Sequence, residues 1–157
     1  MRILGIDPGY ERLGIAILEK RNRKEFVVFS ECFKTKASLD FPERLKLIGE
    51  KIQTIIKEYK PDVLSIETLF LTTNQKTVMH VSEVRGVIIY EAICAELKIF
   101  EASPPQIKIA TTGYGRASKA DILKMVKMLV NIKEDKTSDD EMDAIAIAIT
   151  AFAHIKK

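Results

Sequence analysis

Acidic side chains stand at three places in the sequence where an apolar run meets a turn or a helix. Asp7 closes the first apolar run, Glu67 closes a later one, and Asp140 and Asp143 precede the apolar segment 144–149. Because ligands of open α/β sheets bind where strands meet loops, we expect these acids to converge. Gathered carboxylates repel one another and raise one another's pKa unless cations neutralise them. The pattern therefore predicts a site for divalent metal ions.

Carboxylate oxygens are the ligands that Mg²⁺ and Mn²⁺ prefer. Two such ions about 4 Å apart can activate a water molecule and stabilise the leaving oxygen of a phosphodiester. Each acid also has an ordinary structural explanation, as a turn residue, a strand-end cap or a first-turn helix residue. On the residues alone, only their expected convergence at one sheet edge argues for phosphodiester hydrolysis.

The start of the last predicted helix offers more acids than one site needs. Asp140 and Asp143 are three residues apart and share a helix face, while Asp139 is four residues from Asp143 and would also reach. Helical spacing does not choose between positions 139 and 140. Ser138 and Glu141 have the spacing of a capping box, which explains Glu141 without a catalytic role.

Periodicity predicts three strands, a helix, a strand, a helix, a strand and two helices, in that order. The expected strands are 2–7, 13–18, 26–33, 63–67 and 99–102, and the expected helices are 40–60, 75–97, 119–130 and one that starts at 138. A short segment from Pro104 to the turn at Gly113 links the last strand to the next helix. This order predicts an α/β fold with a five-stranded mixed sheet, whose first three strands are antiparallel and whose helices cover both faces.

Composition places the chain among globular proteins. Of 157 residues, 46% are hydrophobic and 30% charged, so one domain over residues 1–157 is expected. The net charge of +3 favours a polyanionic partner only mildly. Cys32 and Cys94 lack metal or disulfide spacing and are expected to be buried in a reducing compartment. No segment has the length of a signal peptide or membrane span, which predicts a cytoplasmic protein without membrane contact.

Four motifs stand in an order and at distances that resemble one family. They are Gly5-Ile6-Asp7-Pro8-Gly9, Glu67-Thr68-Leu69-Phe70, Val84-Arg85-Gly86 and Asp140-Glu141-Met142-Asp143-Ala144. Together they resemble the RuvC family of bacterial Holliday-junction resolvases over nearly the whole chain. The resemblance implies an RNase H-like fold, catalysis by Asp7, Glu67, Asp140 and Asp143, and two Mg²⁺ ions per subunit, with Mn²⁺ as a substitute. It is the resemblance that selects Asp140 over Asp139.

The resemblance further implies a homodimer that makes paired symmetric nicks in four-way DNA junctions, in recombination and repair, together with RuvA and RuvB. Phe70 matches an aromatic residue that could stack on an unpaired base, and Arg85, in a matching motif, is also expected to bind DNA. Lys108 and Lys119 match basic positions that could hold the scissile phosphate, and Arg116 opens a basic stretch that could follow the backbone. The ordinary alternatives are a core position for Phe70 and solvated surface positions for the cations.

Three other functions compete with this one. The segment from Gly5 to Gly14 also resembles the opening of YqgF-type RNA nucleases, although the stretch from Glu67 to Arg85 would not be expected there. An actin-like or sugar-kinase-like domain could use the same turn to bind a nucleotide phosphate, but those ATPases need a second domain. A non-catalytic junction-binding module would leave the acids unexplained.

Overall fold

The computed structural model describes residues 1–22, 24–69, 75–130, 132 and 137–155. Phe70, which the resemblance places near DNA, lies outside the described residues. The elements are β1 (Arg2–Asp7), β2 (Arg12–Arg21), β3 (Lys24–Lys34), α1 (Phe41–Tyr59), β4 (Val63–Glu67), α2 (Gln75–Cys94), β5 (Lys98–Ala102), α3 (Pro104–Thr112), α4 (Lys119–Val130) and α5 (Asp139–His154).

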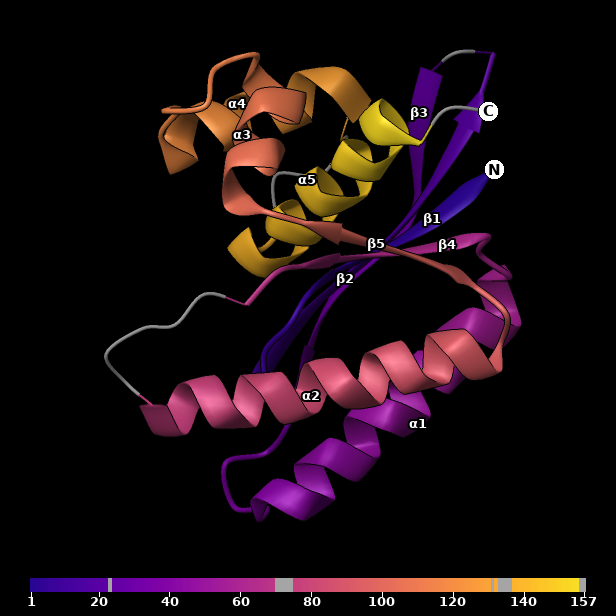
Figure 1. The fold of residues 1–157 in the computed structure, drawn as a ribbon, viewed down its shortest axis with the longest axis vertical. Helices are drawn as coiled ribbons and strands as arrows, with labels where there is room; N and C mark the ends of the chain where they lie inside the picture. Colours follow the sequence, from indigo (N-terminus) through magenta and orange to yellow (C-terminus); the bar gives the residue numbers. More distant parts are fainter. Residues whose placement is uncertain (23, 70–74, 131, 133–136, 156–157) are drawn as a thin grey trace.

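The sheet has the strand order β3-β2-β1-β4-β5 (Figure 1). β1, β2 and β3 pair antiparallel, while β4 pairs parallel to both β1 and β5. The predicted five-stranded mixed sheet is therefore confirmed, and so is the RNase H-like fold that the resemblance implied. Because β1 and β4 are parallel neighbours, their final residues Asp7 and Glu67 lie at the same edge of the sheet.

Helices cover both faces of this sheet, as predicted (Figure 1). α1 and α2 pack on one face, and α3, α4 and α5 pack on the other. Side chains of β1 alternate between the two layers, with Leu4 and Ile6 on the α1–α2 side and Ile3 on the α5 side. A strand buried on both faces is apolar at every position, which explains the continuous apolar run at the N-terminus.

Helix α5 lies directly on the sheet because two glycines leave room for its backbone. A Cβ atom at Gly5 would lie 2.2 Å from the carbonyl oxygen of Ala144, and one at Gly14 would lie 2.1 Å from that of Asp140. Almost every side chain of α5 from Met142 to Phe152 is buried. The close approach brings the start of α5 beside the end of β1.

The region after β5 differs from the sequence-based expectation. The segment predicted only as a link is helix α3, so three helices follow β5 instead of two. Ser103 caps this helix and forms a capping box with Gln106, and Gly113 ends it in the left-handed conformation with φ 75°. The residues that start and end the helix are visible in the sequence, but the helix is too short to show a clear helical repeat of apolar residues.

Helix α2 ends at Cys94, three residues before the predicted end. Glu96 adopts a left-handed φ of 60°, and the Leu97 amide donates to the Ala92 carbonyl at 2.9 Å. Since no glycine marks this stop, the apolar Leu97 extended the predicted helix. The predicted burial of Cys94 is also wrong: both cysteines are free, Cys32 is partly buried, and Cys94 is exposed at the end of α2. Among the described helices, none is long and apolar enough to cross a membrane.

Candidate active site

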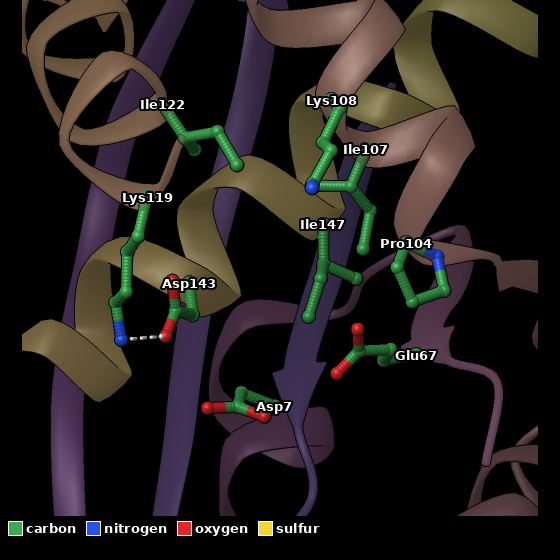
Figure 2. A pocket seen from close by; sticks show the side chains of 9 residues that line it. All are labelled: Asp7, Glu67, Pro104, Ile107, Lys108, Lys119, Ile122, Asp143 and Ile147. Carbon is green, nitrogen blue, oxygen red and sulfur yellow. Dashed lines mark hydrogen bonds and ion pairs between the residues drawn. The ribbon is translucent and has the colours of Figure 1, made fainter. Parts of the chain in front are cut away.

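Three of the four predicted acids line one cleft at the carboxyl edge of the sheet (Figure 2). Asp7 comes from the end of β1, Glu67 from the end of β4, and Asp143 from the first part of α5. The other lining residues are Pro104, Ile107, Lys108, Lys119, Ile122 and Ile147. Elements that are distant in the sequence therefore place three carboxylates and two lysines around one apolar-walled space.

The electrostatics of the cleft favour a proton on Asp7. Burial, followed by the charges of Asp143, Glu67 and Asp140, raises the pKa of Asp7 to about 7. Burial and the charge of Asp143 also raise the pKa of Glu67, while Arg85 opposes that rise. These acids therefore carry more negative charge than their surroundings compensate, as expected where a cation is to bind.

Lys119 supplies part of the compensation from within the cleft. Its Nζ atom donates to Asp143 Oδ2 at 2.9 Å (Figure 2). The same atom lies 3.7 Å from Asp139 Oδ2. The hydrogen bond to Asp143 raises the pKa of Lys119. Lys108 also lines the cleft, whereas Arg116 is exposed on the turn between α3 and α4 and is not part of the lining. The two lysines are the cations closest to where a phosphate would enter.

Asp140 lies apart from the other three acids. Its carboxylate does not line the cleft and instead accepts hydrogen bonds from Arg12, through Nε at 2.9 Å and through Nη2, and from the Cys32 thiol at 3.4 Å. The contact with Arg12 lowers the pKa of Asp140. Asp139 is more exposed and does not line the cleft either. The contact of Arg12 was missed because nothing in the sequence pairs position 12 with position 140.

Arg85 is largely buried on α2, where its side chain contacts the end of β4 and β5. Its side chain is 10% exposed, and its guanidinium donates to the Glu67 carbonyl oxygen and, at 2.5 Å, to Glu101. That Arg85 contacts DNA, as the resemblance implied, stays a prediction. The guanidinium instead joins the end of β4 to β5, and so positions the backbone that carries the Glu67 carboxylate.

The carboxylate oxygens of the cleft are suitable ligands for a hard divalent cation, but the side chains are not spaced closely enough to hold one. Within the described residues, no three Asp, Glu, His or Cys side chains converge tightly enough to hold an ion as they stand. The three cleft acids offer only oxygen ligands, and burial, followed by the charges of Asp143 and Glu67, raises the pKa of Asp7 to about 7. It is the chemistry of this donor set that suits such an ion.

Comparison with known proteins gives a consistent match over the chain. The family model described as crossover junction endodeoxyribonuclease RuvC matches residues 3–151. Relatives with that name from Caldanaerobacter subterraneus and Brevibacillus brevis are 42% and 43% identical, over 95% and 96% of this chain and 90% of each relative. The structure of T. thermophilus RuvC in complex with a Holliday junction substrate superposes with a TM-score of 0.90 and 27% identity, covering 97% of this chain and 93% of that one.

Proposed function

The chain belongs to the RuvC family of crossover junction endodeoxyribonucleases, and we propose that it nicks four-way DNA junctions symmetrically by metal-assisted phosphodiester hydrolysis. The observation that carries the proposal is the cleft where Asp7, Glu67 and Asp143 converge beside two lysines. The similar structure from T. thermophilus holds a Holliday junction substrate, which supports the same class of substrate here. The proposal places the activity in recombination and repair, in the cytoplasm.

The proposed metal ligands are Asp7, Glu67, Asp140 and Asp143. Two Mg²⁺ ions, or Mn²⁺ in their place, would supply an activated water and neutralise the leaving 3′ oxygen, so that products carry 5′ phosphates. Asp7 has to give up its proton before it can act as a ligand, because its pKa is about 7. Arg85 holds the backbone of Glu67 during this change.

The lysines and the apolar wall act on the substrate in this proposal. Lys108 and Lys119 bind the scissile phosphate and offset the charge that develops on its oxygens. Lys119 would be free for this role if Asp143 bound a metal ion in place of its ammonium group. Three isoleucines in the lining, Ile107, Ile122 and Ile147, limit the water around the phosphate and so strengthen these charge interactions.

A basic surface continues from the cleft along α4. Arg116, Lys124 and Lys127 are exposed on the turn before this helix and on the helix itself. We assign them to the DNA backbone, which binds cations without regard to sequence and weakens its hold as salt rises. Phe70, outside the described residues, is proposed to stack on an unpaired base near the junction centre.

Helix α2 supplies the proposed dimer contact. Met79, Tyr90 and Ile93 are 64%, 65% and 59% exposed, and a Cβ at Gly86 would meet no atom within 4 Å. Positions 79, 86, 90 and 93 follow a heptad spacing and form one stripe along the helix. A twofold dimer through the stripe would present one cleft to each of two opposing strands of a junction, and the assembly would work with RuvA and RuvB.

Nicking of a synthetic four-way junction tests the proposal. We expect wild type to nick in Mg²⁺ and Asp7→Asn to bind the junction without nicking it. Asp62→Asn is the matched control, since Asp62 lies at the opposite end of β4 from Glu67 and binds the Arg2 amide. Equal nicking by wild type and Asp7→Asn would rule out the metal role. Preferred cutting of structured RNA would instead support a YqgF-type nuclease.

A further inference from the structure

The contact between Arg12 and Asp140 keeps one proposed metal ligand occupied by a protein cation. A single carboxylate oxygen, Asp140 Oδ2, accepts both guanidinium donors and the Cys32 thiol. Lys119 holds Asp143 in a comparable way, but Lys119 and Asp143 both line the cleft. Arg12 and Asp140 do not, so their contact holds the fourth acid outside the cleft.

The backbone of Asp140 is nevertheless already in place. A Cβ built on Gly14 would lie 2.1 Å from the Asp140 carbonyl oxygen and 3.1 Å from the Asp7 Cβ, so both residues adjoin the same point on β2. Gly14 is also the register partner of Asp7. Because the backbone of Asp140 already lies beside Asp7, a turn of the Asp140 side chain away from Arg12 would bring its carboxylate toward Asp7.

Arg12 has the chemistry to exchange this partner for DNA. Its side chain is 47% exposed at the start of β2, and within the described residues its guanidinium bonds only to Asp140. A guanidinium binds the paired oxygens of a phosphate with the same fork geometry that it uses for a carboxylate. The phosphate backbone of a bound junction is therefore a competitor for Arg12, as a divalent ion is for Asp140.

We propose that Arg12 is a latch that holds Asp140 outside the acidic cleft until a DNA phosphate takes the guanidinium and a divalent ion takes the carboxylate. The latch rests on the proposed metal-dependent nuclease function and adds to it a link between substrate binding and completion of the metal site. Without DNA, the metal has to compete with Arg12 for its fourth ligand.

Calorimetric titration of Mn²⁺ into the DNA-free protein tests the metal side of the latch. Arg12→Gln is expected to bind Mn²⁺ roughly two- to fivefold more tightly than wild type, the range for loss of an exposed ion pair. Arg21→Gln is the matched control, because Arg21 forms a comparable exposed ion pair with Glu19 at the other end of β2. Arg21→Gln should leave the Mn²⁺ affinity within a factor of about 1.5 of wild type.

A double-mutant cycle separates a latch from a general effect of charge. In an Asp140→Asn background the latch has nothing to hold, so adding Arg12→Gln should give no further gain in Mn²⁺ affinity. A gain that persists in that background, or one equalled by Arg21→Gln, would overturn the latch. Unchanged or weaker Mn²⁺ binding by Arg12→Gln alone would overturn it as well.

Junction binding in EDTA tests the DNA side without cleavage. Asp140→Asn frees Arg12, so its affinity should fall more steeply with salt than that of wild type, by about one unit of slope in log affinity against log salt. Asp62→Asn removes a carboxylate at the far end of β4, whose oxygen accepts from the Arg2 backbone amide, and should leave the slope unchanged. Adding Arg12→Gln to Asp140→Asn should restore the wild-type salt slope. If the double variant keeps the steeper slope of Asp140→Asn, Arg12 does not exchange Asp140 for a DNA phosphate.

The two proposals fail in different ways. If wild type nicks junctions and Arg12→Gln does not change the Mn²⁺ affinity, the latch is wrong but the proposed nuclease function is supported. Wild type that neither binds Mn²⁺ nor nicks overturns the proposed function, and the latch with it. Thermal unfolding of each variant verifies that it is folded before either result is read.

Discussion

Burial makes the ionisation of Asp7 costly in the metal-free protein. Its pKa rises from 3.8 to about 7 on folding, so between these values the native state binds more protons than the unfolded state. The stabilising effect of its proton is complete below about pH 4 and is lost as the pH rises through 7. Asp7→Asn should not lose this stability at high pH, since the amide is neutral at every pH.

We therefore expect Asp7→Asn to be more stable than wild type in EDTA at pH 8, by roughly 1 to 4 kcal/mol, and to differ little at pH 4. Urea unfolding at the two pH values measures the difference. The same stabilisation at both pH values would contradict the assignment of a raised pKa to Asp7. With Mn²⁺ present at pH 8, the difference in unfolding free energy between the two proteins should shrink or change sign, because only wild type is stabilised by binding the metal.

Arg85 gives a second prediction at the scale of one residue. If it positions Glu67, Arg85→Ala should lower the nicking rate tenfold or more while leaving the junction affinity nearly unchanged. Glu101→Gln is the control, because it weakens the outer partner of Arg85 and leaves the Glu67 carbonyl contact in place. Single-turnover nicking and a separate binding titration distinguish these effects. A loss of affinity with a shallower salt dependence would show instead that Arg85 contacts DNA.

The sequence predicted where the acids lie, but not the contacts that Arg12 and Arg85 make with them. Strand ends and the helix start located Asp7, Glu67 and Asp143 because these positions follow from local pattern. Arg12 and Arg85 bond to residues 128 and 18 positions away, and such contacts depend on how the elements pack. For the same reason local pattern offered no choice between Asp139 and Asp140.

At the scale of elements, the contact between α5 and β2 depends on the absence of a side chain at Gly14. Gly14→Ala would place a methyl group against the Asp140 backbone, forcing α5 away from the sheet. We expect a destabilisation of about 1–3 kcal/mol or more and a loss of nicking, since Asp140 and Asp143 would move with the helix. Gly115→Ala, whose Cβ would meet Ile109 at an ordinary 3.5 Å, should change stability by less than about 0.5 kcal/mol.

Denaturant unfolding and junction nicking, measured on both glycine variants, check this expectation. Wild-type stability and activity in Gly14→Ala would mean that α5 does not need to lie this close to β2.

The elements themselves followed well from sequence, since every predicted strand and all four predicted helices are present. The errors, an unpredicted α3 and an overlong α2, arose where backbone conformation at Gly113 and Glu96 sets the boundary.

At the scale of the whole molecule, the α2 stripe predicts the oligomeric state. Tyr90→Asp would bury a charge in the proposed interface, so we expect a monomer by light scattering where wild type is a dimer. Met128→Asp is the control, because Met128 is 68% exposed on α4, outside the stripe. The monomer should lose coordination between the two nicks. A wild type that is monomeric at micromolar concentration would contradict the dimer.

The burial of α5 also governs when the protein can act during its own synthesis. The helix forms much of the core on its side of the sheet and also carries Asp140 and Asp143. It leaves the ribosome after every strand, so a nascent chain that already displays Asp7 and Glu67 still lacks half of the acids. The core on this side of the sheet and the acidic start of α5 are therefore completed together, after all five strands.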